Sequence, residues 1–179
     1  MALFGLIRRR THERAGFALY TAAVNAARDP ALFGEGAVPD TLEGRFDVVA
    51  LHAALLVRRL RRDPDTRGAA LAQAVFDAMF ADMDLNLREM GVGDMSIGKR
   101  VRTMWEAFHG RALAYEAALE AGDAPALEGA LARNVWGGDA PEGAAARLAA
   151  HAVGLDAGLA AQPFARFVAG EVDFAGAAA

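Results

Sequence analysis

Hydrophobic positions along the chain recur every three or four residues, which is the spacing of one face of an α-helix. The second such run, over about residues 40–62, has a broad apolar face and therefore predicts a largely enclosed helix. Asp40 and Glu43 have the spacing of a capping box at its start. The first run predicts a helix over residues 11–28, with Thr11 as its N-cap and a buried stripe of Phe17, Tyr20, Val24 and Ala27.

Two longer runs follow, over about residues 68–90 and 94–121, and only "GVG" separates them. Gly91 stands where a left-handed C-cap belongs, and Asp94 stands where an N-cap belongs. The pattern therefore predicts a tight helix–helix corner at residues 88–94. The apolar stripe of the first run is Phe76, Phe80, Met83, Leu87 and Met90, and that of the second is Ile97, Val101, Met104, Phe108, Arg111, Tyr115 and Leu119.

Shorter helices are predicted around residues 124–135 and 142–159, and the three phenylalanines of "QPFARFVAGEVDF" are expected to dock on the core. The fold class is therefore all-α, a bundle-like single domain of six to seven helices. We place this domain at residues 11–170, between an N-terminal tail (1–10) and a frayed C-terminal tail (171–179). In the N-terminal tail, "MALFGLIRRR", a short apolar segment precedes a basic cluster, so a frayed end and a peripheral membrane contact are both open.

Composition narrows the function classes. The chain has 179 residues, 54% hydrophobic and 23% charged, which suits one soluble domain with a substantial core. A net charge of −4 excludes the overall basic field of a DNA-binding domain. The absence of cysteine excludes disulfides, thiol nucleophiles and cysteine-ligated metals. No uninterrupted apolar run reaches the length of a membrane span, and we expect a cytoplasmic protein.

Motifs for metals, cofactors and catalysis are incomplete. Residues 82–93 begin like an EF-hand loop, but Leu87 replaces its glycine and Gly93 replaces its bidentate glutamate. The glycines of "GVGDMS" lack the preceding strand and the third glycine of a dinucleotide site. The histidines show no paired ligand spacing, and His52 is expected to be a hydrogen-bonded core side chain. We therefore predict no cofactor, no metal and no catalytic residue.

Arg111 is the first candidate that remains, because it lies on the apolar stripe between Phe108 and Tyr115. A guanidinium that faces a core needs a partner, since an uncompensated buried charge costs several kcal/mol. Its candidate partners are Asp84, Glu89 and Asp47. The pairing is either an interhelical clasp that fixes packing or the polar floor of a binding site.

The corner itself is the second candidate. Asp84 and Arg88 are one turn apart and can pair on the helix surface, while Gly91 permits the reversal of the chain. A helix–helix corner explains this geometry without any chemistry. The density of charge around Arg88, Glu89 and Asp94 also suits a recognition patch.

Three segments resemble the ubiquinol–cytochrome c chaperone family, whose members are assembly factors of the cytochrome bc complex (respiratory complex III). They are "VPDTLEGRFDVVALH", "AQAVFDAMFADMDLNLREMGVGDMSIGKRVRTMWEAFHGR" and "ALARNVW". The resemblance runs from about Ala15 to Ala150, and the ordered series "LREMGVGD", "GKRV" and "AFHGR" makes it specific. His109 stands where the family has a tyrosine. The chain begins close to the domain, without the targeting extension of mitochondrial members, so we expect a bacterial member.

The resemblance implies a non-enzymatic chaperone that binds newly made cytochrome b and works at the inner face of the cytoplasmic membrane. A small assembly-factor partner and the ribosome are further partners that it allows. Clustered charge beside an apolar stripe favours the helices around the corner as the client or partner site. Its candidate residues are Arg45, Asp84, Arg88, Glu89, Asp94, Lys99, Arg111 and Tyr115.

Three alternatives stay open at this stage. The first is a lipid- or quinone-binding helical module at the membrane surface. The second is a helical-bundle enzyme, although the sequence has no Glu-x-x-His pair. The third is contact with ribosomal RNA through the arginines of "RRLRR" (residues 58–62), which equally read as a solvated helix end.

Overall fold

The computed structural model describes residues 2–174, and this part of the chain is all-α, as the sequence predicts. Its helices pack around α2, which contacts α1, α3, α4, α5 and α6. In the order of the chain, the elements are α1 (Ala2–Ala26), the 3₁₀ helix η1 (Pro30–Leu32), α2 (Leu42–Arg61), α3 (Gly68–Glu89), α4 (Asp94–Ala121), α5 (Ala124–Trp136), α6 (Ala144–Ala160) and α7 (Phe164–Val168).

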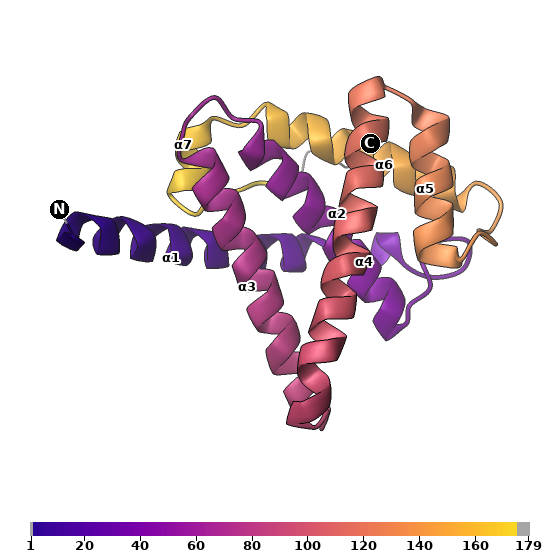
Figure 1. Cartoon of the computed structure of the whole chain (residues 1–179). Helices are drawn as coiled ribbons and strands as arrows, with labels where there is room; N and C mark the ends of the chain where they lie inside the picture. The colour runs from indigo at the N-terminus through magenta and orange to yellow at the C-terminus, as the bar shows by residue number, and fades with distance from the viewer. Residues whose placement is uncertain (1, 175–179) are drawn as a thin grey trace.

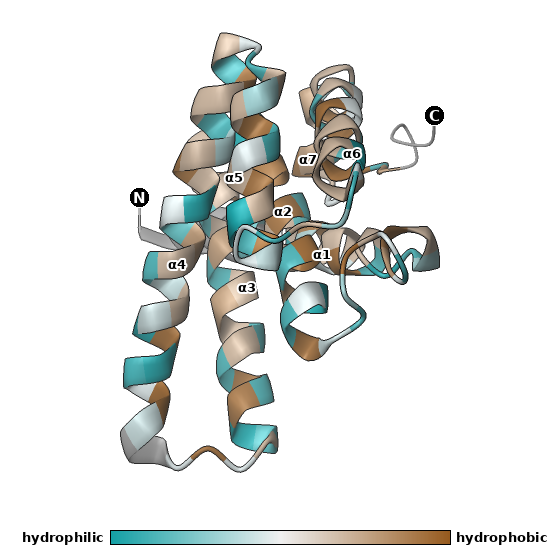
Figure 2. Ribbon diagram, turned by 90° about the vertical axis from the view of Figure 1, so that its right-hand side faces the viewer, coloured by the Kyte–Doolittle hydropathy of each residue, from teal (hydrophilic) through white to brown (hydrophobic). Residues whose placement is uncertain are grey.

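The longest elements extend beyond this packed body. Helices α3 and α4 run antiparallel and converge on a turn that lies well away from the other helices (Figures 1 and 2). The N-terminal half of α1 also projects past the body (Figure 1). The enclosed helix is α2, as its broad apolar face predicts, with Leu51, Leu55, Leu56 and Leu60 at most 1% exposed.

Helix α1 differs from its prediction in both its start and its buried face. It begins at Ala2 rather than at a Thr11 cap, so residues 2–10 continue the helix in place of a separate tail, with the side chains of residues 1–11 outside the described ones. Phe17, which was predicted to be buried, is 63% exposed. Tyr20 and Ala27 of the predicted stripe are buried, and Gly16 lies so close to α3 that an added Cβ would be 2.6 Å from the backbone of Ala74. Close approach of the two backbones at Gly16 fixes the rotation of α1 and leaves Phe17 outside the contact.

The start of α2 is capped one residue later than predicted. The Thr41 hydroxyl accepts a hydrogen bond from the Gly44 amide at 3.1 Å, which makes Thr41 the N-cap. Asp40 lies outside the helix and pairs with Arg45 at 2.5 Å. The predicted capping box of Asp40 and Glu43 is therefore wrong in register, because a second acceptor residue stands next to Asp40.

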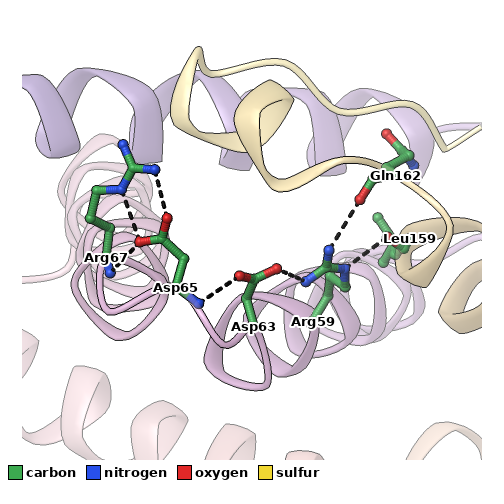
Figure 3. Close-up of polar contacts among 6 residues, drawn as sticks. All are labelled: Arg59, Asp63, Asp65, Arg67, Leu159 and Gln162. Carbon is green, nitrogen blue, oxygen red and sulfur yellow. Dashed lines mark hydrogen bonds and ion pairs between the residues drawn. The ribbon is translucent and has the colours of Figure 1, made fainter.

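The arginines at the end of α2 bind other parts of the same chain. Arg59 donates to Asp63 at 2.7 Å, to the Leu159 carbonyl at 3.0 Å and to the Gln162 carbonyl at 3.0 Å (Figure 3). Arg58 pairs with Asp156 in α6 at 2.6 Å, and Arg62 pairs with Glu120 in α4 at 2.6 Å. Arg61 lies 4.0 Å from Glu116. These contacts join α2 to α4 and α6. The arginines therefore have a structural role within the chain, which accounts for their presence without contact with ribosomal RNA.

The C-terminal segment docks through its phenylalanines, as predicted. Phe167 of α7 is fully buried, and Phe164 and Phe174 pack against the core. Gln162 fixes the end of the described chain, because its side chain donates to the Asp173 carbonyl at 2.7 Å and accepts from the Asp173 amide at 2.9 Å. Residues 171–174 of the predicted frayed tail are therefore held in place, and residues 175–179 lie outside the described ones.

Candidate functional site

The corner between α3 and α4 has the backbone geometry that its glycines predict. Gly91 has a φ of 78°, the left-handed conformation in which a side chain is strained. Its amide donates to the Arg88 carbonyl at 3.0 Å, and the Val92 amide donates to the Leu87 carbonyl at 3.1 Å. This pair of bonds is a Schellman motif, which satisfies the last carbonyls of α3 and reverses the chain within a few residues.

The start of α4 differs in one detail. Gly93 occupies the N-cap position and α4 begins at Asp94 itself. The predicted Asp94 cap is therefore displaced by one residue. The Asp94 side chain is outside the described ones.

Four candidate residues lie along the outer end of this hairpin. The Arg88 Nε donates to Asp84 at 2.7 Å, as their spacing of one helical turn predicts. Glu89 is the last residue of α3 and is exposed, and Lys99 is exposed on the second turn of α4. The corner thus presents carboxylates, a guanidinium and an ammonium to solvent.

Arg111 and Tyr115 lie much closer to the body of the protein. Of the three acids proposed for Arg111, the structure pairs it with Asp47 of α2. Asp47 is 10% exposed and Arg111 23% exposed, so the pair is an interhelical clasp. Burial raises the pKa of the Asp47 carboxyl, and Arg111 opposes that rise. Burial likewise raises the pKa of Tyr115, whose phenol contacts Asn134 of α5.

The candidate residues therefore form two groups. Lys99 and Arg111 are separated by twelve residues of α4, roughly 18 Å along the helix axis. The outer group is Asp84, Arg88, Glu89 and Lys99, and the inner group is Arg111, Tyr115 and their α2 neighbours. Arg45 is two residues before Asp47 in α2. It pairs with Asp40, and its guanidinium carbon lies 5.2 Å from the centroid of the Phe33 ring.

Helix α4 also carries an exposed apolar stripe, which the sequence analysis missed. Trp105, His109 and Leu113 follow one another at steps of four residues, and each is exposed. The Trp105 and His109 rings stack with centroids 5.2 Å apart and planes 7° from parallel. The signal was present in the i, i+4, i+8 spacing, but the stronger stripe through Phe108 draws attention to the buried face.

His52 is a core histidine, as predicted. It is 1% exposed, and its Nδ1 lies 2.8 Å from the Val48 carbonyl. Burial lowers the pKa of its imidazole to about 4. Within the described side chains, no group of three or more histidine, aspartate and glutamate residues is placed to hold a metal ion. The helices that the structure describes include none that is long and apolar enough to cross a bilayer.

These observations define a class of protein, an all-α domain with a projecting helical hairpin that exposes charged side chains and an apolar stripe. The chain belongs to the ubiquinol–cytochrome C chaperone family, which its residues 35–174 match. It is 25% identical over 121 residues to the ubiquinol-cytochrome-c reductase complex assembly factor 1 of Xenopus laevis. That match covers 68% of this chain and 60% of the length of the frog protein.

A solved bacterial structure extends the similarity to nearly the whole chain. The crystal structure of the Cbp3 homolog from Brucella abortus is similar with a TM-score of 0.80 and 33% sequence identity. The match covers 98% of both chains. This relative agrees with the bacterial origin expected from the sequence.

Proposed function

We propose that this protein is a non-enzymatic chaperone that binds newly made cytochrome b and supports assembly of the cytochrome bc complex. The observation that carries the proposal is the family match over residues 35–174. It is supported by the similarity to a complex assembly factor from frog and to a bacterial Cbp3 homolog. Because the chain spans only 60% of the frog protein, the partners of that protein do not transfer directly.

The α3–α4 hairpin is the surface that we propose for the client. An unassembled membrane protein presents apolar helices, and such a helix can lie along an exposed apolar stripe flanked by charge. Trp105 and Leu113 supply the stripe, while Met90, 57% exposed, adds an adaptable side chain at the corner. The outer charges then set the orientation of the client, and the Arg111–Asp47 clasp holds α4 on the body.

A client in the bilayer places the chaperone at the inner face of the cytoplasmic membrane. We propose peripheral contact through residues 2–10, where an apolar segment precedes three arginines. A small assembly-factor partner and the ribosome remain candidate partners from the resemblance. Release of the protein from membranes by high salt, but not by a neutral sugar wash, would support an electrostatic contact of this kind.

The test of the function is deletion of the gene in its host. We expect selective loss of the cytochrome b spectrum and of the assembled bc complex, with other respiratory complexes intact. Normal cytochrome b and a normal bc complex in the deletion strain would refute the chaperone role.

The test of the surface is charge reversal at the corner. The Arg88→Glu/Glu89→Arg variant should fold normally, because both side chains are exposed, but should fail to restore cytochrome b in the deletion strain. The matched control is Arg166→Glu/Glu171→Arg, which reverses an exposed pair at 3.8 Å near α7. Full restoration by both variants would exclude the corner as the client site.

A second candidate function, a lipid- or quinone-binding module, is favoured by one specific observation. A cavity of about 1080 Å³ lies among α1, α6 and the segments 29–38 and 172–174, with largely apolar walls. Mass spectrometry of an organic extract of the purified protein would detect a bound lipid or quinone.

A further inference from the structure

The cavity beside α6 is amphipathic, with an apolar floor and a charged rim. Val38 and Leu148 line the floor and are at most 5% exposed. Asn25, Asp29 and Arg147 also line the cavity, and all three are exposed. Its volume of about 1080 Å³ lies at the upper end of the range of ligand pockets. The cavity therefore has room for a polar headgroup at the rim and a hydrocarbon chain on the floor.

Arg147 supplies a positive charge to this rim. Its guanidinium donates to the Gly36 carbonyl, and no carboxylate of the described residues forms an ion pair with it. A Cβ added at Gly36 would lie 3.6 Å from its Nη2, and one added at Gly143 would lie 2.9 Å from its Nη1. Because neither glycine has a side chain, the guanidinium is left uncovered on these two sides. Its remaining N–H groups can donate to a phosphate, which also balances the charge.

Asp29 supplies the opposite charge from a different segment of the lining. One carboxylate oxygen accepts from the Ala31 amide at 2.9 Å, and no cation of the described residues forms an ion pair with it. The negative charge of Asp29 opposes the fall in the pKa of His151 that burial causes, so the carboxylate lies near that imidazole. Arg147 and His151 are one turn apart on α6, roughly 6 Å along its axis. The two opposite charges of the rim therefore stand near successive turns of the same helix.

This pair of charges distinguishes between classes of amphiphile. A simple anion such as a fatty acid would pair with Arg147 but would be repelled by the Asp29 carboxylate. An uncharged lipid would leave both charges without a partner, and the Nε2 atom of His151 is buried out of its reach. A headgroup with an anionic end and a cationic end complements both residues. The side-chain amide of Asn25, one turn before Asp29, adds a hydrogen-bonding group to the same rim.

We propose that this cavity binds a zwitterionic phospholipid, whose phosphate pairs with Arg147, whose ammonium pairs with Asp29 and whose acyl chain lies on the apolar floor. The proposal rests on the second candidate function and gives it a ligand class. It does not depend on the chaperone role. Binding is measured on the purified protein and assembly in the deletion strain, so the two can fail separately.

The test compares three probes that share a dodecanoyl chain on glycerol, by titration calorimetry on the full chain below the concentrations at which they form micelles. Lauroyl-lysophosphatidylethanolamine carries both charges, lauroyl-lysophosphatidic acid lacks the ammonium, and monolauroylglycerol lacks the phosphate as well. We expect the zwitterion to bind about tenfold more tightly than the lysophosphatidic acid, since one charge-assisted contact is lost, and to exceed monolauroylglycerol by a larger factor.

Three results of this comparison would overturn the proposal. Equal affinity for the zwitterion and for monolauroylglycerol would show that the rim charges do not take part. Equal or tighter binding of the lysophosphatidic acid would remove the ammonium contact and assign the site to anionic amphiphiles. Absence of heat with all three probes would show that the cavity is not a lipid site.

Single substitutions assign each charge. Arg147→Gln should weaken binding of the zwitterion about tenfold and leave monolauroylglycerol unchanged. Asp29→Asn keeps an oxygen that can accept from the Ala31 amide, but it should remove the preference for the zwitterion over the lysophosphatidic acid. Arg133→Gln is the control, because Arg133 is exposed and lies outside the lining. A preference that persists in Asp29→Asn, or an affinity unchanged by Arg147→Gln, would contradict the assignment.

A matched pair of variants locates the acyl chain. Ala150→Phe places a ring at an exposed position of α6 that lines the cavity, and it should weaken binding of all three probes. Ala157→Phe makes the same change at an exposed α6 position outside the lining, and it should leave binding unchanged. Circular dichroism of each variant confirms that the helical fold is retained. Zwitterion binding that is unchanged in Ala150→Phe would place the lipid elsewhere and refute the proposal.

Discussion

Replacement of Arg111 by methionine tests whether the Arg111–Asp47 pair is a clasp that holds α4 on α2. Methionine keeps much of the length and apolar surface of the arginine side chain but removes its charge. Asp47 is 10% exposed, and burial already raises the pKa of its carboxyl in the presence of the arginine. Without the arginine, the carboxylate is left in a low-dielectric site with no opposite charge beside it.

The expected loss of stability is about 2 kcal/mol at pH 7, below the 3–5 kcal/mol typical of fully buried pairs because Arg111 is partly hydrated. For a domain of this size, that corresponds to a decrease in melting temperature of roughly 5 °C. Asp47→Asn should reduce the free energy of unfolding by less. The loss in the double variant should be smaller than the sum of the two single losses by about 1 kcal/mol.

The pH dependence gives a second readout. Removal of Arg111 raises the folded-state pKa of Asp47 further above its unfolded value of about 3.9. A carboxyl with a raised folded-state pKa favours folding below that pKa and loses this contribution as the pH rises through it. The deficit of Arg111→Met should therefore be smaller at pH 5 than at pH 8.

Urea denaturation of the wild type, the two single variants and the double variant at both pH values measures all of these quantities. Additive losses with no dependence on pH would show that the two side chains do not interact energetically. A variant of unchanged stability that nevertheless fails to support cytochrome b would assign Arg111 to the binding surface instead.

Four other substitutions give sharp expectations. The pKa of His52 is lowered to about 4, so the folded state resists protonation of this imidazole. The free energy of unfolding should therefore fall by about 3 kcal/mol between pH 6.5 and pH 4. Urea titrations should show a smaller fall in His52→Leu. Gly16→Ala should destabilise by about 2 kcal/mol, since its Cβ would lie 2.6 Å from the α3 backbone. Gly110→Ala should stabilise the protein by about 1 kcal/mol, because no atom lies near the added Cβ on α4. Melting temperatures of Gly16→Ala and Gly110→Ala that shift in the same direction would contradict this account. Asp84→Asn should change stability by less than about 1 kcal/mol, because its pair with Arg88 is exposed.

The helices and the corner could be predicted because their signals are local. Apolar periodicity depends on one face being buried, and the Gly91 turn depends on a conformation that few other residues adopt. The burial of α2 followed from the width of its apolar face. Each of these properties is encoded within a few consecutive turns of the chain.

The errors have a different origin, because they depend on which neighbour packs where. Phe17 belongs to a plausible apolar stripe, but the close approach of α3 at Gly16 orients α1 so that Phe17 is exposed. The sequence offered three acidic residues as partners of Arg111, and only the packing of α4 against α2 selects Asp47. The cavity was invisible for the same reason, since its walls come from segments more than a hundred residues apart.

The projecting hairpin also has a consequence for local unfolding. The outer turns of α3 and α4 lie beyond the other helices in both views, so their tertiary support there is each other (Figures 1 and 2). The free energy of opening these turns is therefore smaller than that of unfolding the body. Amide hydrogen exchange should be fastest near Gly91 and slow progressively toward Phe108, while the amides around Leu55 exchange only on global unfolding. The hairpin tip can thus rearrange around a bound helix while the core of the protein stays folded.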